Sequence, residues 1–127
     1  MITAKLSNYR QSPRKVRLVT DLIKGKSVEY ALDSLSLLNK RASAPILKLI
    51  ESALANAKHN FSLDKENLFV KELTVDGGVT LHRRMPRARG TANPINKRTS
   101  HVVLVLAPKE VAAKPIKKTA KAVKAKK

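Results

Sequence analysis

The sequence predicts an α+β fold: three helices packed on a small antiparallel sheet, with a long protruding β-hairpin and a disordered basic C-terminal tail. Apolar residues recur at helical spacing in three segments before residue 61, and two apolar segments of strand length follow them. Residues 76–100 join these two segments, which is a long connection for so small a protein. Residues 109–127 contain eight Lys and show no helical or strand periodicity.

The first elements follow from local signals. Residues 1–9 alternate loosely and predict a short strand. Ser12 and Pro13 then predict a helix start, with the Ser12 side chain as cap and the proline at the first helical position. Gly25 is expected to stop this helix in a left-handed conformation. Its expected core side chains are Val16, Val19, Leu22 and Ile23.

Two further helices are expected. The second runs from about Val28 to Leu38. The third begins at Ser43 as cap, holds Pro45 in its first turn because a later proline would break it, and ends around residues 58–60. Its apolar face is broad enough to form the centre of the core. The residues on that face are Ile46, Leu47, Leu49, Ile50, Ala53, Leu54 and Ala57.

Two strands and a hairpin complete the predicted fold. Residues 68–75 read as a strand with a bulge between Val70 and Leu73, and the apolar run 101–106 reads as a strand covered on both faces. Gly77 and Gly78 read as a turn signal. Between the two strands, Pro86 and Pro94 lie symmetrically about Gly90. This symmetry predicts an extended hairpin of roughly 30 Å with Gly90 near its tip and irregular pairing there.

One domain, residues 1–108, is expected, with the hairpin at about 77–100 and a Lys/Ala/Pro-rich tail at 109–127. The formal charge is +18, but residues 27–76 sum to only −1. The excess lies in residues 1–26 (+6), 77–108 (+6) and 109–127 (+7). This distribution indicates a nearly neutral body with basic arms that need a polyanion to organise them.

The hairpin is rich in Arg, whereas the tail is rich in Lys. Guanidinium groups make forked contacts to phosphate and stack on bases, so the hairpin is assigned specific RNA docking and the tail loose electrostatics. A flexible basic loop with no docked state is the plain alternative for the hairpin. A DNA-binding nucleoid-type basic protein is the alternative function, because its coating arms share the composition of the tail.

Several other functions are disfavoured. The chain has no Cys, which excludes a disulfide, a thiolate metal site and a cysteine nucleophile. The three histidines have no metal-ligand spacing, and Ser100 and His101 would point to opposite faces of a strand. We therefore expect no enzyme, no metal and no cofactor. No apolar run is long enough for a membrane span and no helix suits a membrane surface, so a cytoplasmic protein is expected.

Four colinear motifs resemble the bacterial L22 family of large-subunit ribosomal proteins. They are SPRKVRLV at 12–19, SALANAKHN at 52–60, MPRARG at 85–90 and KRTSH at 97–101. The resemblance covers residues 1–106 and implies a body on the outer face of the large subunit, with a hairpin that threads through ribosomal RNA to line the peptide exit tunnel. It also implies a role early in assembly and an association between tip changes and macrolide resistance.

The implied partners are large-subunit ribosomal RNA, neighbouring ribosomal proteins and the nascent peptide, with no membrane and no DNA. The expected RNA-binding residues are Arg10, Arg14, Lys15, Arg17, Lys24, Lys26, His82, Arg83, Arg84, Arg87, Arg89, Lys97, Arg98, Thr99, Ser100 and His101. The expected tunnel-facing tip consists of Met85, Pro86, Arg87, Ala88, Arg89, Gly90, Thr91, Ala92 and Asn93.

Overall fold

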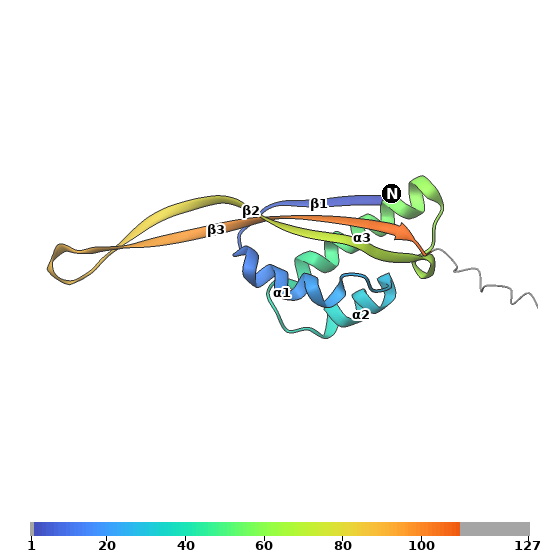
Figure 1. The fold of residues 1–127 in the computed structure, drawn as a ribbon, viewed down its shortest axis with the longest axis horizontal. Helices are drawn as coiled ribbons and strands as arrows, with labels where there is room; N and C mark the ends of the chain where they lie inside the picture. The colour runs from blue at the N-terminus through green and yellow to red at the C-terminus, as the bar shows by residue number, and fades with distance from the viewer. Residues whose placement is uncertain (1, 110–127) are drawn as a thin grey trace, which may run out of the picture.

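The computed structural model describes residues 2–109 and confirms the α+β class (Figure 1). The predicted disorder of the tail falls on residues that lie, apart from Lys109, outside the described part of the chain. The elements are β1 (Ile2–Tyr9), α1 (Pro13–Ile23), α2 (Val28–Leu37), α3 (Ser43–Phe61), the short 3-10 turn η1 (Lys65–Asn67), β2 (Leu68–Pro86), the 3-10 turn η2 (Ala88–Gly90) and β3 (Ala92–Pro108).

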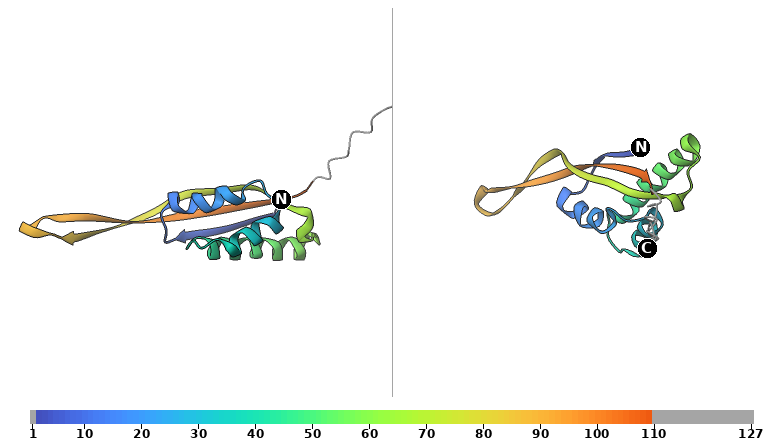
Figure 2. Two further views of the ribbon diagram at one scale, coloured as in Figure 1. Left: turned by 90° about the horizontal axis from the view of Figure 1, so that it is seen from below. Right: turned by 45° about the vertical axis from the view of Figure 1, so that its right-hand side comes forward.

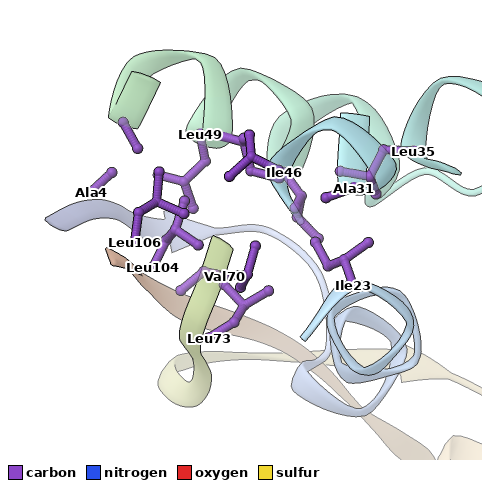
Figure 3. Packing of buried hydrophobic residues seen from close by; sticks show 14 of the residues in the cluster. Ala4, Ile23, Ala31, Leu35, Ile46, Leu49, Val70, Leu73, Leu104 and Leu106 are labelled. Atoms are coloured by element: carbon purple, nitrogen blue, oxygen red, sulfur yellow. The ribbon is translucent and has the colours of Figure 1, made fainter. Parts of the chain in front are cut away.

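The three strands form one antiparallel sheet in the order β1-β3-β2, so the last strand is central. The helices lie on one side of it, and the core fills the space between (Figure 3). Alternate residues of β3, namely Val102, Leu104 and Leu106, are buried, while Val103 and Val105 between them are half-buried. The expectation that this strand is covered on both faces was therefore wrong. Its second face is apolar because Val suits a pleated, half-buried surface.

Helix α1 begins and ends as predicted, but its core face differs in two details. Ser12 is the cap residue by position, yet its side chain makes no capping hydrogen bond. Leu22 is 42% exposed, and Thr20 is buried in its place, donating its hydroxyl to the Arg17 carbonyl (3.0 Å). A buried Thr is tolerated because that hydrogen bond satisfies its polar atom. Gly25 has the predicted left-handed conformation, with φ of 75°.

Helix α3 provides the centre of the core, as predicted. Ile46, Leu49 and Ile50 are buried, and Figure 3 shows Ile46 and Leu49 above Leu104 and Leu106 of β3. Burying each such side chain contributes about 1.5–3 kcal/mol. The cap prediction was one residue late, because Ala42 takes the cap position. The Ser43 hydroxyl instead donates to the Leu38 carbonyl (2.9 Å), which ties the helix to the end of α2.

Strands β2 and β3 continue beyond the body as a two-stranded ribbon (Figures 1 and 2). The predicted bulge is present as a register shift between Val70 and Glu72. Gly77 and Gly78 do not form a turn. The strand runs through them without reversing, and a second register shift lies between Gly77 and Thr80. An irregularity of this kind increases the local twist of the strand.

The tip of the hairpin is more regular than predicted. Pairing is unbroken from Thr80 opposite Arg98 to Pro86 opposite Ala92. Prolines are tolerated because each strand of a two-stranded ribbon has an outer edge where no N–H is needed. The centre of the reversal is Arg89 (φ of 57°), one residue before Gly90 (φ of 72°). The tip is closed by the Arg87 N–H, which donates to the Thr91 carbonyl (2.8 Å).

Candidate nucleic-acid interface

The projecting part of the hairpin, residues 81–98, is exposed at every position. It contains no Asp or Glu, and its cationic residues are Arg83, Arg84, Arg87, Arg89, Lys97 and Arg98. In residues 2–109 the only ion pair joins Lys65 to Glu29 at 3.8 Å, on the body. The charges of the ribbon therefore have no counter-charge among the described residues.

The register sorts the hairpin side chains onto two faces. Arg83 and Arg84 are adjacent in sequence and therefore lie on opposite faces. The face of Arg83 also carries Leu81, Met85 and Ile95, which are 38%, 47% and 40% exposed. The opposite face mixes polar side chains with two prolines and an alanine, and on it His82 Nδ1 lies 2.8 Å from Asn96 Oδ1. One face can thus bury apolar surface against a partner while both present guanidinium groups.

A cleft of about 750 Å³ lies at the root of the hairpin. It is lined by the connection from β1 to α1, by the first turn of α1, by the connection from α2 to α3, and by β3. The cleft brings together the predicted residues Arg10, Lys15, Lys97 and Arg98. It also contains Arg41, which sequence reasoning missed because this residue lies in a loop of the neutral segment with no motif around it.

A second, smaller cleft of about 410 Å³ shares Ser12 and Arg98 with the first, and it holds Arg14 and Arg17. Arg17 has an internal role as well. Its Nε and Nη2 atoms donate to the Val75 carbonyl at 3.1 and 2.7 Å, which fastens α1 to β2 at the level of the hairpin root.

Three more predicted RNA-binding residues are engaged inside the protein. Thr99 donates its hydroxyl to the Val79 carbonyl (2.7 Å), and Ser100 donates its hydroxyl to the Gln11 carbonyl (2.5 Å). His101 Nδ1 accepts from the Asn8 N–H (3.1 Å). Thr99 and Ser100 are buried, so these side chains position the root of the hairpin and the connection after β1.

Lys24 and Lys26 lie outside these two clefts, although Lys24 lines a third cleft, of about 320 Å³, together with Arg17. They follow the C-terminal end of α1, whereas the first two clefts surround its N-terminal end, and a helix of 11 residues is about 16 Å long. Lys26 Nζ lies 5.9 Å from the centre of the Tyr30 ring. The predicted set therefore divides into the hairpin, its root and this pair.

Residues 4–107 match the family model for ribosomal protein L22p/L17e. The chain belongs to this family. It is 55% identical over 100 residues to the large ribosomal subunit protein uL22 of Deinococcus radiodurans, covering 79% of this chain and 75% of the relative. It is 52% identical over 106 residues to uL22 of Lactobacillus gasseri, covering 84% and 91%. The uL22 of Macrococcus caseolyticus is 54% identical over 102 residues, covering 80% and 82%.

Membership of the L22p/L17e family confirms the resemblance found in the four motifs, all of which lie within the matched residues. A ribosomal protein of this family is a structural component of the ribosome and not an enzyme, and its place is the ribosome in the cytoplasm. Within residues 2–109, no His, Asp or Glu side chains gather in a group of three that could hold a metal ion. No helix in that range is long and apolar enough to cross a membrane.

Proposed function

We propose that this protein binds large-subunit ribosomal RNA through its hairpin and the hairpin root, assists assembly of that RNA, and lines the nascent peptide exit tunnel with the hairpin. As a family member it is a structural constituent of the large ribosomal subunit. The observation that carries the RNA proposal is the ribbon itself: it is fully exposed, cationic throughout and free of carboxylates. An isolated two-stranded hairpin is marginal in water, so such a ribbon needs an anionic surrounding.

The RNA-binding residues are proposed to act in two ways. Arg83, Arg84, Arg87, Lys97 and Arg98 contact phosphates directly, because their side chains are exposed. Thr99, Ser100 and His101 act as positioning residues through the hydrogen bonds described above. Phosphate contacts from both faces of the ribbon suit insertion into folded RNA, which surrounds it, better than a duplex that offers one groove. A DNA-binding function has no support among the relatives.

The tip, residues 85–93, is proposed to face the tunnel and the nascent peptide. Its side chains are all exposed. Its turn is held by two hydrogen bonds, from the Arg87 N–H to the Thr91 carbonyl and from the Thr91 hydroxyl to the Ala88 carbonyl. Changes of this tip are expected to alter macrolide sensitivity. The proposed unit of function is a single RNA-binding domain at residues 1–108, followed by a tail at 109–127 that adds sequence-independent attraction to RNA.

Single-cysteine cross-linking tests this proposal, because the natural chain has no Cys. Ala88→Cys places a thiol at the tip, and Ala55→Cys places one at an exposed position of α3 as the matched control. Ribosomes carrying either variant are washed in high salt, sedimented through sucrose and stalled during translation. A thiol-reactive group on the nascent chain should cross-link to residue 88 and not to residue 55.

The outcomes separate the parts of the proposal. Salt-resistant comigration with the large subunit supports RNA binding. Equal cross-linking at residues 55 and 88, or none at residue 88, contradicts the tunnel role. Absence of the chain from the large-subunit peak, with recovery on nucleoid DNA, contradicts RNA binding.

A further inference from the structure

The cleft at the hairpin root combines charge from parts of the chain that are distant in sequence. Its cationic lining comes from five residues, and no Asp or Glu lines it: Arg10, Lys15, Arg41, Lys97 and Arg98. Its volume of about 750 Å³ falls in the ~300–1,000 Å³ range of ligand-binding sites. Cations gathered in this way repel one another unless an anion lies between them.

Hydrogen bonds hold two of the connections that line the cleft. The Tyr9 hydroxyl donates to Gln11 Oε1 (2.7 Å) and lies 3.2 Å from the Arg41 carbonyl oxygen. The buried Ser100 hydroxyl donates to the Gln11 carbonyl. These contacts fix the backbone that carries Arg10 and Arg41. Because the Gln11 side-chain oxygen is occupied, its amide nitrogen is the end left to donate to a ligand.

Arg41 is the cation of this cleft that comes from the α2–α3 connection. Its backbone is held by Tyr9, but its guanidinium makes no hydrogen bond or ion pair with any residue from 2 to 109. It therefore contributes nothing to the internal contacts described, unlike Arg17, whose guanidinium fastens α1 to β2. A guanidinium without an internal partner at the edge of a carboxylate-free cleft is suited to a forked contact with phosphate.

We propose that this cleft binds backbone phosphates of RNA and that Arg41 is one of the residues that contact them. The proposal rests on the proposed RNA-binding function and names a specific site within it. Because Arg10, Lys15 and Arg41 belong to the body and Lys97 and Arg98 to the hairpin, a phosphate held here is bound by both parts at once. Occupation of the cleft thus fixes the hairpin relative to the body.

The neighbouring lysine offers a matched control. Lys40 and Arg41 lie in the same connection, both are exposed, and only Arg41 lines the cleft. Arg41→Gln and Lys40→Gln remove the same charge. Arg41→Gln should weaken binding to a transcript of large-subunit ribosomal RNA roughly tenfold in 0.1 M salt, the lower end for hydrogen bonds to a charged group. Its salt slope should become shallower by about 1, whereas Lys40→Gln should leave the slope unchanged. Equal effects of the two variants on RNA binding would overturn the proposal. Unfolding midpoints equal to that of the unaltered chain would show that neither variant disturbs the fold.

A second measurement keeps this inference separate from the proposed function. Inorganic tripolyphosphate is titrated into the isotope-labelled full chain, and backbone amide shifts are followed by NMR. The expected result is saturable shifts at residues 10–12, 14, 15, 41 and 96–99 that Arg41→Gln abolishes and Lys40→Gln keeps. Shifts spread evenly over all basic segments would overturn the proposal that the cleft is a specific phosphate site. If the unaltered chain failed to bind the transcript, the proposed function would fall, and the titration would still decide whether the cleft takes phosphate.

Discussion

A close contact between strands determines how the hairpin leaves the body. Gly78 lies against β3 so tightly that a Cβ there would be 2.5 Å from Thr99 Oγ1 and 2.8 Å from His101 Nε2. Neither neighbour can move freely, because the Thr99 hydroxyl is bonded to the Val79 carbonyl and the His101 ring to the Asn8 N–H. Gly77, the preceding residue, would meet nothing within 4 Å. Two adjacent glycines thus have different roles.

This difference predicts the effect of two alanine substitutions. Gly78→Ala should lower the free energy of unfolding by about 1–3 kcal/mol, the usual cost of forcing extra atoms into a packed site. Gly77→Ala, as the control, should change it by less than about 0.5 kcal/mol, because its Cβ enters open space. Urea denaturation followed by circular dichroism measures both. Similar values for the two variants would mean that the strands can separate at this point without cost.

Helices and strands could be predicted from the sequence, whereas their register could not. Helix spacing in residues 43–61 identified the core face of α3, because burial of a helix follows directly from its period. Most of the basic residues of the site could be predicted from the sequence, but not which of them the fold brings together. Ser100 reads like any polar residue beside a basic run, and its burial follows from pairing with Tyr9 across the sheet. Arg41 joins the cleft only because the α2–α3 connection folds back to Tyr9. Such long-range contacts leave no local pattern.

The hairpin and the body should differ strongly in local stability. In the body, the backbone hydrogen bonds of α3 and β3 are covered by buried side chains, whereas those of the ribbon are open to water. In hydrogen exchange on the free protein, residues 46–58 and 101–106 should be protected and residues 80–98 should exchange quickly. Adding large-subunit ribosomal RNA should protect 80–98. Strong protection of residues 83–97 without RNA would show that the ribbon holds its structure alone.

At the scale of the whole molecule, charge and packing are separated along the chain. Residues 27–76 carry α2, α3 and the first part of β2, and they are nearly neutral in sum. The basic segments lie outside these residues in the sequence, before residue 27, between residues 77 and 108, and after residue 108. The separation lets the core fold without large self-repulsion while the cationic parts await a polyanion. Stability and RNA affinity should therefore respond differently to salt.

Affinity for large-subunit ribosomal RNA should depend steeply on salt concentration. The hairpin and its root together place about ten cationic side chains where phosphates can reach them, and each neutralised phosphate releases condensed counterions. The logarithm of the binding constant should then fall with the logarithm of salt concentration at a slope of about −7 to −9. Filter binding over a series of salt concentrations measures this slope. A slope shallower than about −3 would mean that few of these cations meet phosphate, and the polyanion model of the ribbon would fail.

Removing residues 109–127 should lower the affinity for RNA without changing which RNA is bound, because contacts to the phosphate backbone of RNA carry no sequence information. The same filter-binding measurement, made with ribosomal and unrelated RNA, tests this prediction, and a loss of selectivity would contradict it.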